Sequence, residues 1–252
     1  VDAYVLFDDA RFREVALGII SFLMNELSHP EGGFFASQDA DVTPDDEGGY
    51  FTWTDDDFAK VLTEEECKVL SLHLLDNHGT MHHDGSKKVL FNAMDVDGIA
   101  LQLSMDKDRV GSVIRGGKEK LLRERRKREK PFIDKAIYTS LNGMLISAFF
   151  KAYKALGIEE VKGFALKSLE RVLTLNMADN RLLHSEGVEA MSDDYINLID
   201  ALICAYEVTG DEEYLHKADM FMDECMKKFW DKDEGGLFDT ERDVVGMRLK
   251  GV

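Results

Sequence analysis

The sequence has 252 residues, of which 44% are hydrophobic and 32% charged, and its formal net charge is −18 at pH 7. A chain of this length and hydrophobic content can bury a sizeable core, which argues against a disordered protein. The negative charge disfavours phosphate backbones and anionic lipids, so we expect neither a nucleic-acid nor a membrane partner. Three dispersed cysteines without a CxxC pair, and no apolar run approaching the roughly 18 residues that span a bilayer, predict a cytoplasmic protein.

In chain order, the first predicted element is a helix hairpin, with a turn at Asp8-Asp9 and a second helix ending near Leu27. It is the first copy of a repeat that is clearest later, where Asn142–Val161 aligns with Tyr195–Tyr214 at a constant offset of 53 residues. A period near 50 indicates stacked supersecondary units.

A long loop follows the first hairpin. Its paired glycines and the short run Tyr50-Phe51-Thr52-Trp53 predict a small β-hairpin within residues 31–54. Three carboxylates lie in this loop, at Asp39, Asp41 and Glu47. Trp53 is either a platform for a ligand or part of a hydrophobic base that holds the loop in place.

Two groups of residues are similar to metal sites, but neither matches an established ligand pattern. The acidic spacing from Asp39 to Glu47 is similar to an EF-hand, but Pro44 stands where glycine is needed and Tyr50 where a bidentate glutamate is needed. The histidines between His73 and His83 follow no established zinc spacing. Since the chain also has no Walker-type or GxGxxG loop, we predict no metal and no cofactor.

The next distinctive segment, Lys118–Lys130, is basic in an acidic chain. A solvated helix whose Leu121 and Leu122 touch the core explains it better than a nucleic-acid site does.

The repeat units contain two kinds of helix. Ile137–Leu156 and Tyr195–Val208 are apolar around most of their circumference, which predicts buried inner helices. Glu159–Leu175 and Asp211–Phe229 alternate apolar and charged residues at helical spacing, which predicts outer helices with one wet face. Alternating inner and outer helices joined by tight turns predict an all-α fold, an incomplete α/α toroid of helix hairpins.

This topology places the longer loops on one face of the molecule. Asp134 precedes one inner helix, and Asp193, Asp194 and Tyr195 open another on the same side. Carboxylates beside aromatic rings are the residue types that sugar chemistry uses, as general acid, general base and stacking platform. The aspartates are equally suited to capping the helix N-termini, and both interpretations stay open.

The ordered motifs EGGFFASQDAD, EGGYFTWT, RKREKPFID with NGM, DDYINLIDALICAYEVTG and FWDKDEGGLFDT resemble the spermatogenesis-associated protein 20 family. That resemblance implies a six-hairpin glycosidase-like and N-acylglucosamine 2-epimerase-like toroid that follows a thioredoxin-like domain. Residues 1–252 would then form a single partial toroid domain, without the thioredoxin-like domain and the final helices. The exposed apolar edges of such a domain would favour self-association.

The resemblance also implies a set of residues at the mouth of the toroid. We assign candidate catalytic roles to Asp39, Asp134 and Asp194, and candidate substrate-binding roles to the remaining positions, Asp41, Glu47, Trp53, Asn142 and Tyr195. The chain departs from the family pattern at Ala136, where a lysine is usual, and at Leu141, where a tryptophan is usual, and both departures bear on catalytic competence.

Two functions are compatible with these observations. One is a carbohydrate-binding or carbohydrate-active toroid, epimerase-like or glycoside-hydrolase-like, with a sugar or sugar derivative as its ligand. The other is a non-catalytic helical-repeat scaffold, or protein-interaction module, that works with a thioredoxin-like domain. Facing carboxylates across an enclosed pocket would favour the enzyme, whereas capped aspartates and a filled funnel would favour the scaffold.

Overall fold

The computed structural model describes residues 1–45, 48–178, 181–243 and 248–250. They form two compact units: unit 1 is Val1–Ser37 with Ile133–Val252, and unit 2 is Gln38–Phe132. Unit 2 is thus inserted in the sequence after the first helix pair of unit 1. That residues 1–252 form one domain stays a prediction.

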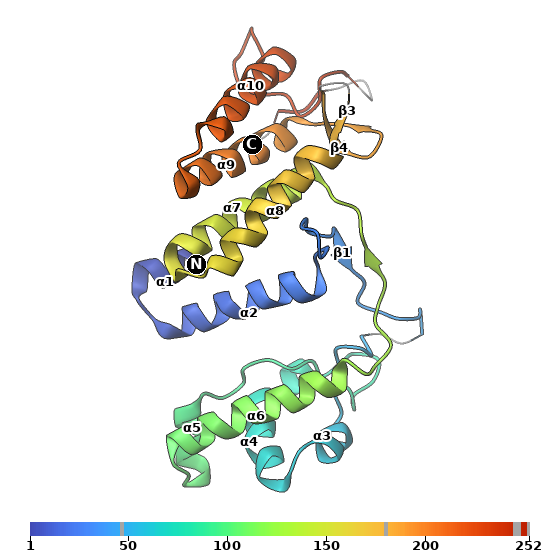
Figure 1. The fold of residues 1–252 in the computed structure, drawn as a ribbon. Coiled ribbons are helices and arrows are strands. Elements are labelled where there is room, and N and C mark those ends of the chain that lie inside the picture. The colour runs from blue at the N-terminus through green and yellow to red at the C-terminus, as the bar shows by residue number, and fades with distance from the viewer. Residues whose placement is uncertain (46–47, 179–180, 244–247, 251–252) are drawn as a thin grey trace. The chain divides into compact units, whose positions relative to one another are not determined.

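Unit 1 consists mainly of three helix hairpins (Figure 1). The first pairs α1 (Asp2–Phe7) with α2 (Ala10–Glu26), and the second pairs α7 (Thr139–Leu156) with α8 (Glu159–Leu175). The third pairs α9 (Ser192–Thr209) with α10 (Glu212–Phe229). The bounds of α7 and α9 differ by 53 residues at both ends, which confirms the repeat.

The turns inside the hairpins end each first helix in the left-handed conformation. Gly157 has φ 68° after α7, Gly210 has φ 73° after α9, and Asp8 has φ 49° after α1. Glycine adopts this conformation without steric cost, so the helix stops and reverses within a few residues.

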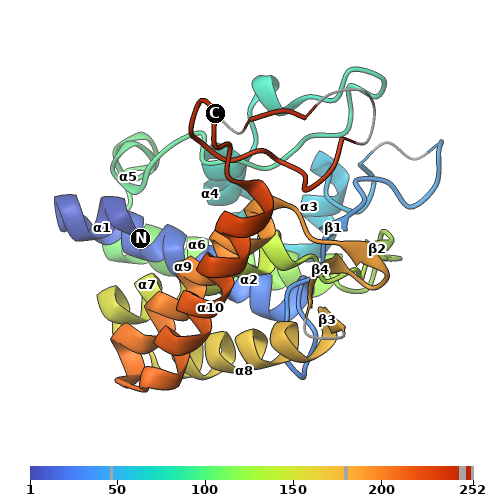
Figure 2. The same cartoon turned by 90° about the horizontal axis from the view of Figure 1, so that it is seen from above.

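Helices α7 and α9 pack against each other, and each also packs against its own hairpin partner; Figure 2 shows α10 lying over α9. The inner helices bury more of their residues than α8 and α10, although Met144 and Ile196 remain 51% and 46% exposed along one stripe. The hairpins have the inner and outer arrangement predicted for part of an α/α toroid, and the predicted fold class is confirmed.

The β structure differs in detail from the prediction. Strand β1 (Ser37–Gln38) pairs with β2 (Ile133–Asp134), and Trp53 forms a bridge with Lys88. In the described part of loop 31–54, the two expected strands therefore do not pair with each other. One pairs with β2 and the other with Lys88, both of which lie farther along the chain. An antiparallel three-stranded sheet forms instead between α8 and α9, from β3 (Met177–Ala178), β4 (Arg181–Ser185) and β5 (Val188–Glu189).

Unit 2 contains α3 (Asp55–Val61), α4 (Glu64–Leu74), the 3-10 helix η1 (Asn77–Gly79), α5 (Val96–Leu103) and α6 (Lys107–Arg125). Thr54 and Thr63 begin α3 and α4 with reciprocal capping boxes. The helices enclose their own hydrophobic core, which includes Trp53, Phe58, Leu70, Ile99 and Val110.

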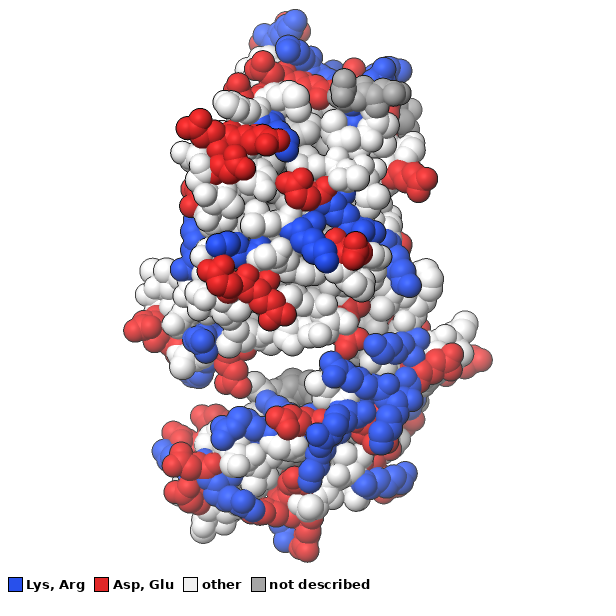
Figure 3. Space-filling view, in the orientation of Figure 1, with Lys and Arg blue, Asp and Glu red and all other residues white. Residues whose placement is uncertain are grey.

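The basic segment forms the second half of α6 and the turn after it, and its blue side chains gather on the face seen in Figure 3. Leu121 is buried, whereas Leu122 is 37% exposed. Lys120 binds Glu66 at 2.7 Å, and Lys127 binds Glu124 at 2.6 Å. Part of the positive charge is therefore neutralised within unit 2, as expected for a solvated helix.

Two further observations apply to the part of the chain that the structure describes. Each helix there is too short or too polar to cross a bilayer. No group of three or more His, Cys, Asp and Glu side chains among those residues is arranged to hold a metal ion.

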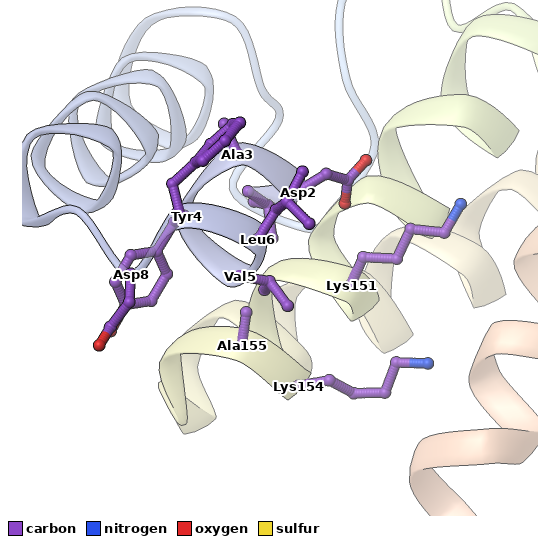
Figure 4. A pocket seen from close by; sticks show the side chains of 11 residues that line it. Asp2, Ala3, Tyr4, Val5, Leu6, Asp8, Lys151, Lys154 and Ala155 are labelled. Carbon is purple, nitrogen blue, oxygen red and sulfur yellow. The ribbon is translucent and has the colours of Figure 1, made fainter.

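The first hairpin exposes an apolar surface, made by Val5, Leu6, Phe7, Val15 and Ile19, which are each more than half exposed. Figure 4 shows α1 facing the last turns of α7, which carry Lys151 and Lys154. The groove between the two helices has a volume of about 1090 Å³. Exposed apolar surfaces of this kind favour association. Self-association stays a prediction.

We expect Leu6→Glu to shift the protein from dimers or larger species toward the monomer, because a charge at the centre of this surface opposes its burial. Light scattering of size-separated protein over a range of concentrations would measure the shift. Leu101→Glu, at a leucine of α5 that is 85% exposed, is the matched control. A monomeric wild type, or equal effects of the two substitutions, would contradict the prediction.

Candidate functional site

The carboxylate of Asp194 lies in the first turn of α9 and is fully buried. Its Oδ1 accepts the backbone N–H of Ser140 in α7 at 2.8 Å, and its Oδ2 accepts that of Met191 at 2.8 Å. Helix α7 has no side-chain cap from its own N-cap residue, so Asp194 supplies one from the neighbouring inner helix. One carboxylate thus holds the starts of both inner helices together.

The same carboxylate binds His184, a residue of β4 that the sequence analysis did not identify. His184 Nδ1 lies 2.9 Å from Oδ1 and 3.1 Å from Oδ2 of Asp194. A carboxylate only accepts hydrogen bonds, so Nδ1 carries the proton. The ring stacks on Tyr138, with centroids 4.7 Å apart and planes at 22°, and the side chain keeps 20% of its surface exposed.

This arrangement makes His184 able to transfer protons. With Nδ1–H directed at the buried carboxylate, Nε2 accepts a proton when the ring is neutral and donates one when it is charged. His184 also lies in the connection from an outer to an inner helix, on the face where the topology places the longer loops. Its place in a long connection on that face is the feature by which His184 could have been identified from the sequence.

Asp193, next to this pair, has a raised pKa. Although the residue is exposed at the surface, loss of hydration at the carboxylate is the main cause, and the negative charge of Asp194 adds to the shift. The group is therefore protonated up to a higher pH than an ordinary aspartate.

Asn142 is buried in α7 and forms hydrogen bonds with the first glycine-rich loop, which contains Gly32, Gly33 and Phe34. Its Oδ1 accepts the N–H of Phe34 at 2.7 Å, and its Nδ2 donates to Phe34 O at 3.0 Å and Tyr138 O at 2.9 Å. These bonds satisfy the amide and fix the loop against the start of α7. They also place Asn142 one helical turn from the residue that stacks on His184.

Tyr195 lies in the core of unit 1 rather than on a wall of a pocket. Its side chain is fully buried, and its ring meets the edges of Phe221 and Phe229. Lys228 Nζ donates to its hydroxyl at 2.9 Å, and burial raises the pKa of Tyr195 to about 12. A substrate-binding role for the ring stays a prediction.

Asp134 lies in β2, ahead of α7, and is half-buried. Its Oδ1 accepts the N–H of Ala136 at 2.9 Å, and its backbone carbonyl accepts that of Ala36 at 3.1 Å. Asp134 therefore stabilises its own turn, while Asp194 caps α7. The structure shows no contact between these two carboxylates.

The remaining candidates belong to unit 2. Asp39 and Asp41 are exposed, and Asp41 Oδ1 accepts the N–H of Gly48 at 2.7 Å. Trp53 is 2% exposed, and the guanidinium of Arg128 lies 4.1 Å from the centre of its ring. Arg128 also donates to the carbonyls of three loop residues, Gly49, Tyr50 and Thr52. Glu47 lies outside the described residues.

A cavity of about 580 Å³ lies in unit 1, and His184 itself is not among the residues that line it. Ser185 and Ile137 line it, and these residues directly adjoin His184 and Tyr138 in the chain. Asn176 lines it as well, and its Nδ2 donates to Ile137 O at 2.9 Å and to Thr139 Oγ1 at 2.8 Å. The segments that support the imidazole are thus also walls of a cavity in the size range of small-molecule sites.

Comparison with known proteins confirms the resemblance seen in the motifs. The chain is 26% identical to human spermatogenesis-associated protein 20 over 98% of its own length and 37% of that protein. It is 27% identical to an uncharacterised protein of Caenorhabditis elegans over 90% of its length and 36% of that protein. The chain therefore spans little more than a third of these relatives. No family model matches it.

Two solved structures are similar to the chain at a low level. A D-mannose isomerase is 17% identical with a TM-score of 0.39, over 93% of this chain and 74% of the other. A sugar epimerase from a ruminal bacterium is 15% identical with a TM-score of 0.37, again over 93% and 74%. Because these TM-scores are low, the site described above stands on the contacts of this chain alone.

Proposed function

We propose that unit 1 carries a sugar site of an epimerase-like enzyme, in the cavity at the N-terminal end of α7 that Ser185, the residue after His184, helps to line. The single observation that supports this most is the imidazole of His184, which a fully buried carboxylate orients and an aromatic ring supports. In this proposal Asp194 is a positioning residue, and His184 exchanges protons with the ligand.

The geometry favours proton transfer over glycoside hydrolysis. Hydrolysis by the usual route needs two carboxyl groups that flank the scissile bond. Asp194 is fully buried and bound to two backbone N–H groups and to His184, so it does not present a free carboxylate to a sugar. An imidazole with one free nitrogen is suited to removing and returning a proton at the carbon next to a sugar carbonyl.

The test is a thermal-shift screen against mono- and disaccharides, sugar phosphates and N-acyl sugars, since a ligand of the native state raises its melting temperature. We expect at least one sugar to give a shift that His184→Gln abolishes. Turnover of that sugar should fall by about 100-fold or more in the same variant, because the proton-transfer group is lost.

His216→Gln, at an exposed histidine of α10, is the matched control and should keep both binding and turnover. A sugar whose binding and turnover survive in His184→Gln would show that the site lies elsewhere. Absence of any shift in the wild type would refute a sugar site.

Specific observations also support a second function, a non-catalytic scaffold. Asp194 and Asp134 both accept backbone N–H groups, and Trp53 is packed in the core of unit 2. These are structural uses of three candidate residues. The scaffold is the proposal to keep if the sugar screen is negative, and its test is then a search for protein partners, including a thioredoxin-like domain.

A further inference from the structure

Arg171 of α8 is a half-buried cation without an acceptor in the part of the chain that the structure describes. Its Nε is fully buried and makes no hydrogen bond there, and no carboxylate among those residues pairs with its guanidinium. Other cations of α8 are satisfied: Lys162 binds Glu159 at 3.1 Å, and Lys167 donates to Pro30 O at 2.9 Å. Burying a charge without a partner costs stability, so the unpaired state of Arg171 requires an explanation.

The first glycine-rich loop packs closely against the side chain of Arg171. A Cβ at Gly33 would lie 3.4 Å from Arg171 Cδ and 3.0 Å from Ile137 Cδ1, and the Gly33 N–H donates to Ser168 Oγ at 2.9 Å. The close backbone therefore confines the stem of Arg171 between α8 and the loop. A confined side chain loses less conformational entropy when it binds a ligand.

Arg171 lines the same cavity of about 580 Å³ as Ser185, the residue after His184. Lys135 adds a second positive charge to its wall, and Glu186 adds one negative charge. Neither Lys135 nor Arg171 forms an ion pair with another described residue. The described part of the cavity thus carries more positive than negative charge, although the whole chain carries −18.

We propose that Arg171, assisted by Lys135, binds an anionic group, a carboxylate or a phosphate, on the sugar that occupies this cavity. The inference rests on the proposed sugar site and narrows its ligand to acidic sugars or sugar phosphates. A guanidinium offers paired donors that match the oxygens of either group. Because Nε is fully buried, the terminal amino groups of the guanidinium would hold the bound anion.

The test compares ligands that differ only in the acidic group. Binding of glucose, glucuronate, glucose 6-phosphate and inorganic phosphate is measured calorimetrically at one ionic strength. We expect one of the two acidic sugars to bind at least about tenfold more tightly than glucose, because a charge-assisted bidentate pair is worth that much or more. The preferred sugar identifies the anion as carboxylate or phosphate.

Arg171→Gln should remove this preference, and Lys135→Gln should reduce it. Arg115→Gln, which removes one exposed positive charge from α6 in unit 2, is the matched control and should leave the preference unchanged. If glucose binds as well as both acidic sugars, or if Arg171→Gln keeps the preference, the anion site is refuted while the sugar site stands. If no sugar binds but phosphate does so through Arg171, the anion site stands and the proposed function fails.

A stability measurement distinguishes the proposed binding role of Arg171 from a purely structural one. The methionine of Arg171→Met ends at the position of Nε, so it keeps the unbranched stem and replaces the unsatisfied buried nitrogen with a methyl group. We expect its melting temperature to equal or exceed that of the wild type while the preference for the acidic sugar is lost. A lower melting temperature would show that Arg171 supports the fold, and would count against the proposal.

Discussion

Gly143→Ala is expected to destabilise unit 1 by about 3 kcal/mol, toward the upper end of what overpacking usually costs. Gly143 lies where the backbone of α7 packs directly against that of α9. A Cβ there would lie 2.5 Å from the backbone carbon of Asn197 and 2.6 Å from its carbonyl oxygen. Backbone atoms within a helix cannot turn aside, so the two inner helices must separate. Urea unfolding followed by circular dichroism would measure the loss.

The matched control is the same substitution at Gly163 of α8, which is exposed and has no atom within 4 Å of an added Cβ. There the only change is helix propensity, and alanine should stabilise the helix by up to about 1 kcal/mol. One substitution in two neighbouring helices is thus predicted to act with opposite signs. Equal effects would show that α7 and α9 are not in close contact.

The helices of unit 1 were predictable because their signals are local. Residues 159–175 alternate apolar and charged positions over several turns, and Gly157 and Gly210 mark the ends of the preceding helices. Of the helices of unit 2, only the one that carries the basic segment Lys118–Lys130 was predicted. Helix α3 has only 7 residues and α4 only 11, too few for a clear period, although the capping boxes at Thr54 and Thr63 were visible in the sequence.

The candidate site was less predictable because it depends on contacts between distant residues. Asp194 caps α7 through Ser140, 54 residues away, and its bond to His184 requires the short sheet that precedes α9. Trp53 appears in the sequence as an aromatic residue in an acidic loop. Its burial follows from packing against Phe58 and Arg128, which no local pattern shows. Local patterns therefore located the face of the site but not the roles of its residues.

Asp194→Asn is expected to lower the free energy of unfolding by about 3 kcal/mol, in the range for breaking a buried charged network. The carboxylate accepts from Ser140 and Met191 and pairs with His184. An amide of the same shape has one oxygen, and its NH₂ group would face a donor at 2.8 to 3.1 Å. Urea unfolding would measure the loss, and hydrogen exchange should show faster opening of the first turns of α7 and α9.

Asp200→Asn on the same helix is the control. Asp200 is 52% exposed and its partner Lys151 lies 3.8 Å away, so the change should stay within about 0.5 kcal/mol. A double-mutant cycle with His184→Gln then separates the two roles of Asp194. If the carboxylate orients His184, the two substitutions should couple by about 1 kcal/mol, because each removes the same bond. If the two changes in unfolding free energy simply add, Asp194 acts only as a helix cap. The proton-transfer role of His184 would then lack the carboxylate that orients its ring.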